Sequence, residues 1–267
     1  MFKAGFIGGG NMALAIIGGI IKSGVLLPED IIVSDRTPEM LTAIEKKYGV
    51  NTTLDNREVA QRSQLIFLTI KPQFYQNVIE QIKDTFLAES EKIVITVAPG
   101  WTLARTGSAF GGSCKIVRTM PNTPAFVGEG ITAACKNDLV ATAEMEQVCQ
   151  LLGSFGRVEI LPEGLFDAFT ALCGSSPAFV FMMIEAMADA AVREGILRSQ
   201  AYILASQAVL GSAKMVLELG RHPAELKDMV CSPGGSTIEG VRALEESGMR
   251  AAFFKAVEQT AAKSKNM

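Results

Sequence analysis

Three consecutive glycines, Gly8, Gly9 and Gly10, follow an apolar run close to the first methionine. With Ala13, the first and third of them fit the pattern G-x-G-x-x-G/A, between a stretch typical of a strand and one typical of a helix. In this pattern Gly8 permits a tight turn, Gly10 lets the backbone approach a pyrophosphate, and Ala13 keeps the helix close to the sheet. The N–H groups at the helix start would then face a diphosphate. A plain tight turn is the simpler interpretation, but the surrounding strand and helix favour a dinucleotide site.

The stretch VSDRT, residues 33–37, ends the next expected strand and bears on which dinucleotide is bound. Side chains alternate along a strand, so Ser34 and Arg36 lean one way and Asp35 the other. If Ser34 and Arg36 face the ribose, a hydroxyl and a guanidinium meet a 2′-phosphate, and the cofactor is NADPH. If Asp35 faces it, the carboxylate bonds a free 2′-OH and repels phosphate, which favours NADH. We favour NADPH and keep NADH open, with a merely solvated loop as the third interpretation.

Three later strands are each expected to end just before a proline, in IKPQ (70–73), VAPG (97–100) and MPNTP (120–124). Open α/β sheets bind ligands at the carboxyl ends of their strands, and proline fixes the backbone there. A single proline at this position usually does no more than end the strand. Three at successive strand ends, with Lys71 and Asn122 as polar groups, predict a lined cleft where a nicotinamide ring could be held.

The stretch CSPGGSTIEG, residues 231–240, is the second cluster whose residue types and spacing could bind a ligand. Pro233, Gly234 and Gly235 predict a tight turn that leads into a helix N-terminus, with Ser236 and Glu239 as a capping box. Several N–H groups would converge on one point and bind an anion, for which a carboxylate is suitable. The Thr237 hydroxyl could bond a polar atom of the same ligand. An ordinary turn between helices is the alternative.

Familiar catalytic sets are missing from the sequence. The single histidine, His222, precedes Pro223 and is predicted to belong to a helix start, and there is no Ser-His-Asp set, HExxH motif or carboxylate pair. The cysteines at 114, 135, 149, 173 and 231 lack CxxC or zinc spacing, so we expect reduced thiols and no metal site. A reaction here must not require a strong imidazole acid. Reduction of a C=N bond qualifies, because an imine can be protonated before hydride arrives.

These loops need a scaffold, and the first 160 residues supply one by alternating β-branched runs with amphipathic stretches. We predict strands at 4–8, 31–35, 65–70, 92–97, 115–120 and 157–161, and helices at 11–22, 38–48, 56–62, 74–88 and 141–153. The alternation predicts an α/β fold, a Rossmann-type doubly wound and mostly parallel sheet. We therefore expect a dinucleotide-binding domain over residues 1–162.

After residue 162 the pattern is entirely helical, which predicts an all-helical domain over residues 163–267 for substrate binding and dimerisation. Helices are expected over 177–194, from Ser199 to Gly220, from Pro223, and from Ser236 to Gly248, with 263–267 as a frayed tail. The first of these carries apolar residues on nearly every side, more than a small bundle can cover. A helix of that kind needs a partner, so we expect an intimate homodimer.

Composition narrows the classes of function. The 267 residues are 48% hydrophobic and 20% charged with a net charge near −3, and no run of Lys or Arg marks a nucleic-acid or membrane surface. The most apolar stretch, PAFVFMMIEAMADAAV, is interrupted by Glu185 and Asp189, so we expect a buried helix rather than a membrane span. The expected first strand begins at Phe2, without room for a leader segment. We expect a cytoplasmic protein.

The motifs FIGGGNMA, IKPQ, MPNTPA, GSSPAF and above all SPGGSTIEG resemble those of the pyrroline-5-carboxylate reductase family along essentially the whole chain. The resemblance implies a Rossmann domain followed by a helical domain that interlocks with a second subunit, as a dimer that often builds larger assemblies. It also implies the last step of proline biosynthesis, in which NAD(P)H reduces 1-pyrroline-5-carboxylate to L-proline.

The resemblance also implies site residues. The substrate carboxylate would lie on the backbone amides of the SPGGST segment, and the Thr237 hydroxyl would bond the ring nitrogen as the catalytic group. The expected substrate-binding residues are Ser232, Gly234, Gly235, Ser236 and Thr237. The expected cofactor-binding residues are Gly8, Gly10, Asn11 and Met12 at the pyrophosphate, Ser34 and Arg36 at the 2′-phosphate, Asn56 at the adenosine end, and Ile70, Lys71, Pro72, Ala98, Pro121 and Asn122 near the nicotinamide.

The chain departs from the family where GSSPAF replaces GSGPAY, so that Ser176 stands for a glycine and Phe179 for a tyrosine. Any role of that tyrosine hydroxyl is lost. Two other functions fit parts of the sequence. A 3-hydroxy acid dehydrogenase would share the layout but needs a Lys or His acid on the first long helix of the second domain, where we find none. A non-enzymatic dinucleotide sensor would need only the first domain.

Overall fold

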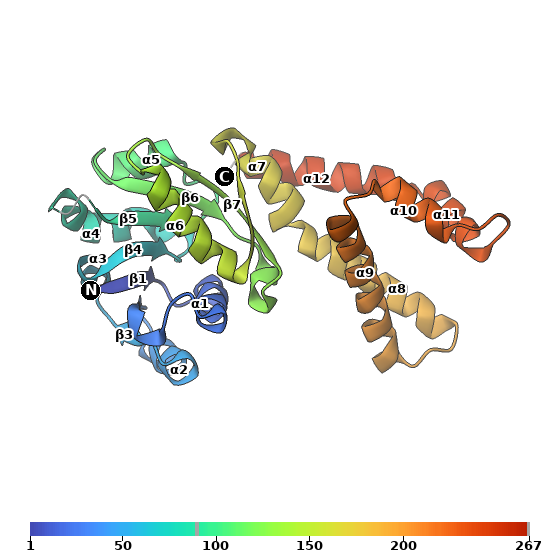
Figure 1. Cartoon of the computed structure of the whole chain (residues 1–267), viewed down its shortest axis with the longest axis horizontal. Coiled ribbons are helices and arrows are strands. Elements are labelled where there is room, and N and C mark those ends of the chain that lie inside the picture. The colour runs from blue at the N-terminus through green and yellow to red at the C-terminus, as the bar shows by residue number, and fades with distance from the viewer. Residues whose placement is uncertain (89–90, 266–267) are drawn as a thin grey trace. The chain divides into compact units, whose positions relative to one another are not determined.

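The structure, a computed structural model of the whole chain, describes residues 1–88 and 91–265 (Figure 1). Its contacts define two compact units. Unit 1 comprises residues 1–174 and the C-terminal stretch from Ala261, and unit 2 comprises Ser175–Thr260. This division falls later than residue 162, the boundary that the sequence suggests for the dinucleotide-binding domain, which stays a prediction.

Unit 1 is built on one sheet, in which the described residues form strands in the order β3-β2-β1-β4-β5-β6-β7-β8. All neighbours pair in parallel except β6 and β7, which are antiparallel. The predicted doubly wound, mostly parallel α/β fold is confirmed. The strands are β1 (Phe2–Ile7), β2 (Ile31–Ser34), β3 (Asn51–Thr53), β4 (Ser63–Leu68), β5 (Ile93–Thr96), β6 (Lys115–Met120), β7 (Gly130–Lys136) and β8 (Gly156–Ile160).

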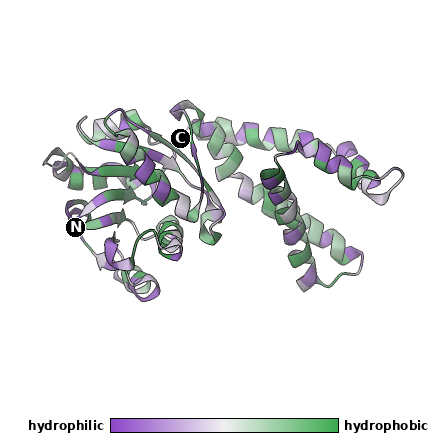
Figure 2. Cartoon of the chain, in the orientation of Figure 1, coloured by the Kyte–Doolittle hydropathy of each residue, from purple (hydrophilic) through white to green (hydrophobic). Residues whose placement is uncertain are grey.

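Helices cover both faces of this sheet, which explains why its strands are apolar without alternation. On β4, Phe67 belongs to the core under one face, while Ile66 and Leu68 belong to the core under the other. Phe6 and Phe67 stack with ring centroids 4.7 Å apart. Figure 2 shows the apolar colour of these central strands. One face packs on α1 (Asn11–Ser23), α2 (Pro38–Tyr48) and α6 (Thr142–Leu152), and the other on α3 (Asn56–Arg62) and α4 (Tyr75–Ala88), with α5 (Leu103–Ala109) beside α4.

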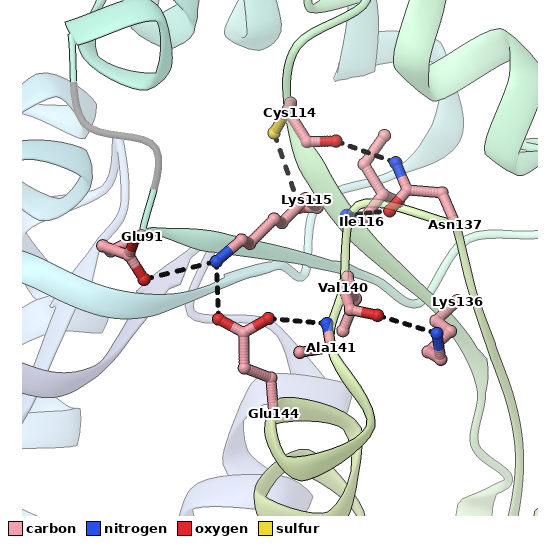
Figure 3. A network of polar contacts seen from close by, with 9 residues as sticks. All are labelled: Glu91, Cys114, Lys115, Ile116, Lys136, Asn137, Val140, Ala141 and Glu144. Atoms are coloured by element: carbon pink, nitrogen blue, oxygen red, sulfur yellow. Dashed lines mark hydrogen bonds and ion pairs between the residues drawn. The ribbon is translucent and has the colours of Figure 1, made fainter.

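Polar contacts fix the antiparallel end of the sheet (Figure 3). Lys115 Nζ lies 2.6 Å from Glu144 Oε1, while Glu144 Oε2 accepts the N–H of Ala141 at 2.8 Å. Asn137 bridges the start of β6, since it accepts the N–H of Ile116 and donates to the carbonyl of Cys114. The first residues of β6 are therefore tied both to the end of β7 and to the beginning of α6.

Beyond β8 the chain turns helical within unit 1, through the short helix α7 (Phe166–Phe169) and a π-helical turn at Thr170–Gly174. The last described residues of the chain also belong to this unit. Ser264 is buried and donates a hydrogen bond to Asp167 on α7 at 2.7 Å. The expectation of a frayed tail is wrong for residues 263–265, because this contact anchors the last helical turn; residues 266–267 lie outside the described ranges.

Unit 2 is helical, as predicted. It contains α8 (Ser176–Arg193), α9 (Arg198–Leu219), α10 (Pro223–Val230), α11 (Ser236–Glu246) and most of α12 (Met249–Lys265). Small residues allow α8 and α9 to pack closely, with Ala188, Ala201 and Ala205 buried between them. The expectation that α8 is a buried helix is wrong for the single chain, because Ala188 is its only buried residue.

Candidate active site

The glycine-rich loop lies between β1 and α1, as its sequence predicts. Gly8 has φ +103°, and a Cβ there would come within 2.7 Å of Ile70 and 3.0 Å of the Thr69 backbone. Only glycine combines this conformation with this close approach. The loop is also held from both neighbouring strands, because the N–H of Gly8 donates to the Ser34 carbonyl at 2.8 Å and Thr69 Oγ1 donates to the Gly8 carbonyl at 2.6 Å.

The N-terminus of α1 is open to an anion. Gly10 is its N-cap residue, no side chain caps the helix, and its first turn carries no acidic residue. A Cβ added at Gly10 would find no atom within 4 Å, so the missing side chain leaves free space directly before the helix. Unpaired N–H groups and the helix dipole both favour a negative group at such a place.

A pocket of about 500 Å³ opens at the carboxyl ends of β1, β2 and β4. It brings together many residues that the sequence predicts for the cofactor: Gly8, Gly10, Ser34, Arg36, Asn56, Ile70 and Lys71. Asp35, which the sequence leaves as the alternative to Arg36, also lines it. The remaining predicted cofactor residues are not among the lining residues: Asn11, Met12, Pro72, Ala98, Pro121 and Asn122.

One wall of the pocket was not predicted from the sequence. It comes from Thr69 at the end of β4 and from Phe74, Asn77, Val78 and Gln81 in and before α4. The residues from 74 to 81 recur at intervals of three or four, which places them on one face of a helix. That spacing, directly after the proline-ended strand, is the signal that could have identified them.

A chain of side-chain hydrogen bonds crosses one side of this pocket. Ser34 Oγ lies 2.8 Å from Asn56 Oδ1, and Asn56 Nδ2 lies 3.0 Å from Gln81 Oε1. Ser34 is fully buried, so the Asn56 and Gln81 amides lie nearer to the open space than the serine hydroxyl does. The chain ties β2 to α3 and α4 and presents neutral polar groups to a ligand.

Arg36 is one of two exposed cations of this pocket, together with Lys71. Its guanidinium lies over the Phe74 ring, 5.1 Å from the centroid. An arginine stacked in this way keeps its N–H donors in the plane, where they can bond the oxygens of a phosphate. The residues predicted from VSDRT therefore separate, with Ser34 buried in the pocket wall and Arg36 at its rim.

The two proline-ended segments after β4 and β5 are locked together by aromatic side chains. The buried Tyr75 hydroxyl donates to the Leu68 carbonyl at 2.6 Å and accepts the N–H of Val97 at 3.2 Å, and burial raises its pKa well above the usual value. Trp101 Nε1 donates to the Pro72 carbonyl at 3.1 Å. These bonds hold the backbone of both segments, and Ala98 lies buried beneath them.

The MPNTP segment behaves differently. The Asn122 amide is buried, with Oδ1 accepting the N–H of Ile131 at 2.9 Å and Nδ2 donating to the Cys173 carbonyl at 3.0 Å. Both ends of this side chain are thus used to join the end of β6 to β7 and to the π-helical turn. A place for Asn122 and Pro121 beside the nicotinamide stays a prediction.

The SPGGST segment forms a tight, exposed turn in unit 2, between α10 and α11. The N–H of Gly235 donates to the Ser232 carbonyl at 3.0 Å, and Gly234 has φ +68°. The predicted capping box is wrong: Ser236 is the first residue of α11 and Gly235 is its N-cap, without a side-chain cap. Because no side chain takes them, the N–H groups at the start of α11 stay available to an anion. The hydroxyls of Ser236 and Thr237 are on exposed residues of that first turn.

Two further predictions concern the histidine and the residues that could bind a metal ion. His222 belongs to a helix start, as expected, because its Nδ1 accepts the N–H of Ala224 at the N-cap of α10. Across residues 1–88 and 91–265, His, Cys, Asp and Glu side chains form no group of three that could hold a metal ion. The cysteines described are free, and burial raises the pKa of Cys135 to about 11.

A mostly parallel sheet with a glycine-rich loop, an uncapped helix start and an arginine at the rim of the pocket defines a dinucleotide-binding protein of the Rossmann class. Comparison with known proteins agrees, since residues 3–100 match the family model "NADP oxidoreductase coenzyme F420-dependent". Residues 163–267 match the model "Pyrroline-5-carboxylate reductase dimerisation".

Similar proteins extend over the whole chain. A pyrroline-5-carboxylate reductase of Escherichia coli K12 is 46% identical over 99% of this chain and 98% of its own length, and one of Arabidopsis thaliana is 38% identical over 100% and 95%. The crystal structure of the Plasmodium falciparum enzyme with NADP bound has a TM-score of 0.89 at 31% identity, covering 99% of this chain and 97% of that one. The chain belongs to the pyrroline-5-carboxylate reductase family.

Proposed function

We propose that this protein reduces 1-pyrroline-5-carboxylate to L-proline with NADPH, the last step of proline biosynthesis. The observation that carries the proposal is full-length similarity to pyrroline-5-carboxylate reductases together with the dinucleotide pocket of unit 1. We propose NADH as a second cofactor of the same pocket.

The residues of the pocket fit a phosphorylated dinucleotide. The free space before α1, where Gly10 has no side chain, and the uncapped helix start suit the diphosphate, with Gly8, Asn11 and Met12 around it. Arg36 and Asn56 would hold the 2′-phosphate, with Ser34 supporting Asn56 from within the wall. Ile70, Lys71, Pro72, Ala98, Pro121 and Asn122 remain our candidates for the nicotinamide end. When bound, the reduced nicotinamide supplies a hydride.

The SPGGST segment is proposed to bind the substrate carboxylate. The backbone N–H groups of Ser232, Gly234, Ser236 and Thr237 can bind a carboxylate, helped by the dipole of α11. The Thr237 hydroxyl would bond the ring nitrogen and orient the C=N bond. Holding both reactants in a fixed arrangement can remove about 7–11 kcal/mol of a reaction barrier. The proton can come from water or from substrate that binds already protonated.

The protein is further proposed to be a cytoplasmic homodimer that assembles into a larger homo-oligomer. The helical run Glu163–Arg193 is long and apolar enough to cross a membrane, and only 11% of its most apolar window is buried in the single chain. Because residues 163–267 match a dimerisation domain, we assign this apolar surface to a second subunit rather than to lipid.

The direct test is oxidation of NADPH and, separately, NADH by the purified protein, with and without 1-pyrroline-5-carboxylate. Substrate-dependent oxidation of NADPH with formation of proline is expected. If neither nucleotide is oxidised when substrate is added, the reductase assignment is wrong. Turnover of 3-hydroxy acids would then favour the dehydrogenase alternative, and nucleotide binding without any turnover would favour the sensor.

A further inference from the structure

Gly9 is the middle residue of the three-glycine loop and has no role in the G-x-G-x-x-G/A pattern. The structure gives a reason for its lack of a side chain. A Cβ at Gly9 would come 2.6 Å from Ile44 Cδ1 on α2 and 3.5 Å from Asp35 Oδ2. The loop therefore lies directly against α2 and against the turn that follows β2.

Asp35 makes the polar part of this contact. Its Oδ2 accepts the N–H of Gly9 at 2.8 Å, and its Oδ1 accepts the N–H of Thr37 at 2.9 Å. One carboxylate thus joins the glycine-rich loop to the turn after β2, since Asp35 lies 26 residues after Gly9 in the sequence. Hydrogen bonds to a charged acceptor are stronger than those between neutral groups, so Asp35 holds the two segments together strongly.

The same hydrogen bonds show which groups the Asp35 carboxylate contacts. Both oxygens accept N–H groups of the protein's own backbone, while the Arg36 guanidinium lies over Phe74 at the pocket rim. The two neighbouring charges of VSDRT consequently serve different partners. Arg36 is available to a phosphate, and each oxygen of the Asp35 carboxylate accepts a hydrogen bond from the backbone around the loop.

Asp35 completes a set of contacts that hold the glycine-rich loop. Gly8 is bound through its N–H to the Ser34 carbonyl and through its own carbonyl to Thr69 Oγ1. Asp35 adds the contact at Gly9, one residue before the free space at Gly10. A loop that is already held in its binding shape loses less entropy when a ligand arrives, and therefore binds it more tightly.

We propose that Asp35 is a positioning residue that fixes Gly9 to the turn after β2 and so pre-forms the diphosphate site for NADPH and NADH alike. The proposal rests on the proposed function, because it requires both nucleotides to bind in this pocket. The proposal gives Asp35 the same role for both cofactors and assigns the choice between them to Arg36.

The test compares the wild type with Asp35→Ala, Asp35→Asn and Arg36→Ala. Dissociation constants for NADPH and NADH are measured by titration calorimetry, and KM and kcat by the oxidation assay. Asp35→Ala is expected to raise Kd and KM about tenfold for both nucleotides, which leaves their ratio unchanged within twofold, with a smaller effect on kcat. Asp35→Asn keeps an acceptor oxygen for one N–H and should give an intermediate loss. Arg36→Ala should weaken NADPH alone.

Three results would overturn the role of Asp35. Tighter NADPH with weaker NADH in Asp35→Ala would mean that its charge selects the cofactor, and unchanged constants for both would mean that it positions nothing. A lowered melting temperature with fewer active sites but unchanged Kd would indicate a purely structural residue and would contradict the proposal equally. If the wild type binds neither nucleotide, the proposed function itself fails and the inference with it.

Discussion

At the scale of single residues, Arg36 is the group most directly tied to a choice between nucleotides. Its guanidinium lies at the pocket rim over Phe74, and charge-assisted hydrogen bonds contribute about 1.5–3 kcal/mol each. Arg36→Ala should therefore raise the KM for NADPH about 10- to 100-fold and change the KM for NADH less than twofold. Steady-state kinetics with both nucleotides measures this.

Arg36→Lys is the matched control for that prediction, because it keeps the positive charge and loses the planar donor set. It should recover part of the NADPH affinity. Equal losses for NADPH and NADH in Arg36→Ala would place the guanidinium away from the 2′-phosphate.

Thr237 is the residue on which the proposed substrate chemistry depends. It is exposed in the first turn of α11, so replacing its hydroxyl should leave the fold intact. Thr237→Val keeps the shape and removes one hydrogen bond to the substrate, which predicts a 10- to 100-fold loss of kcat/KM for 1-pyrroline-5-carboxylate, or about 1.4–2.7 kcal/mol. The Kd for NADPH should not change.

Thr237→Ser provides the comparison, since it restores the hydroxyl without the methyl group and should retain most of the activity. A Thr237→Val enzyme with wild-type kcat/KM would show that the hydroxyl does not contact the reacting substrate.

At the scale of helices and strands, the Lys115–Glu144 contact joins β6 to α6 and depends on pH. Burial opposes the charge of Glu144, but the hydrogen bonds from Lys115 and Ala141 outweigh it and hold the pKa of this carboxyl below its usual range. The bond to Glu144 raises the pKa of Lys115. The stabilisation by Glu144 is therefore complete above its unfolded pKa of about 4.3, and is lost as the pH falls through the lower folded value.

Glu144→Gln should accordingly lower the free energy of unfolding by about 1–2 kcal/mol at pH 7. The difference from wild type should shrink as the pH falls below about 4. Denaturant unfolding at a series of pH values measures both. Glu91→Gln is the control. Glu91 is highly exposed and lies 3.3 Å from the same Lys115 Nζ, farther than Glu144, so it should contribute little. Equal losses in the two variants would contradict the assignment of the stabilisation to the shorter contact.

The same elements show how far the sequence determines the fold. Strands such as β4 are predictable because burial on both faces makes them continuously apolar. By contrast, β7 reads GITAACK, with β-branched residues only at Ile131 and Thr132, and it forms because β6 and β8 pair with it. Pairing between distant segments does not depend on a local sequence pattern, so the sequence analysis does not predict β7 or the three-residue strand β3.

The candidate site shows the same limit. The loop is predictable because a tight turn and a close approach to the backbone both require glycine, and Gly8 and Gly10 are visible as glycines in the sequence. Asn122 looks like a ligand-binding amide at a strand end, yet its partners are the backbone of Ile131 and Cys173. An asparagine that satisfies distant backbone groups cannot be told from one that binds a ligand until those groups are placed.

At the scale of the whole molecule, the exposed apolar surface of unit 2 is the feature that the single chain does not explain. On α8, Phe181 and Met182 are 62% and 68% exposed, and Ile203 on α9 is 69% exposed. Together with Tyr202, the first two line a pocket of about 370 Å³ between the helices. Burying apolar area stabilises an assembly by roughly 25 cal/mol per Å², so a surface of this kind favours association.

Phe181→Asp should therefore weaken the homodimer and increase the fraction of monomer, because a carboxylate placed in an apolar interface loses its hydration without gaining a partner. Mass photometry of wild type and variant at nanomolar concentration, and light scattering at micromolar concentration, measure the change. Leu54→Asp replaces a similarly exposed apolar residue of unit 1, at 64%, and should leave the assembly unchanged. A wild type that is monomeric at micromolar concentration and floats with lipid vesicles would instead assign this surface to a membrane.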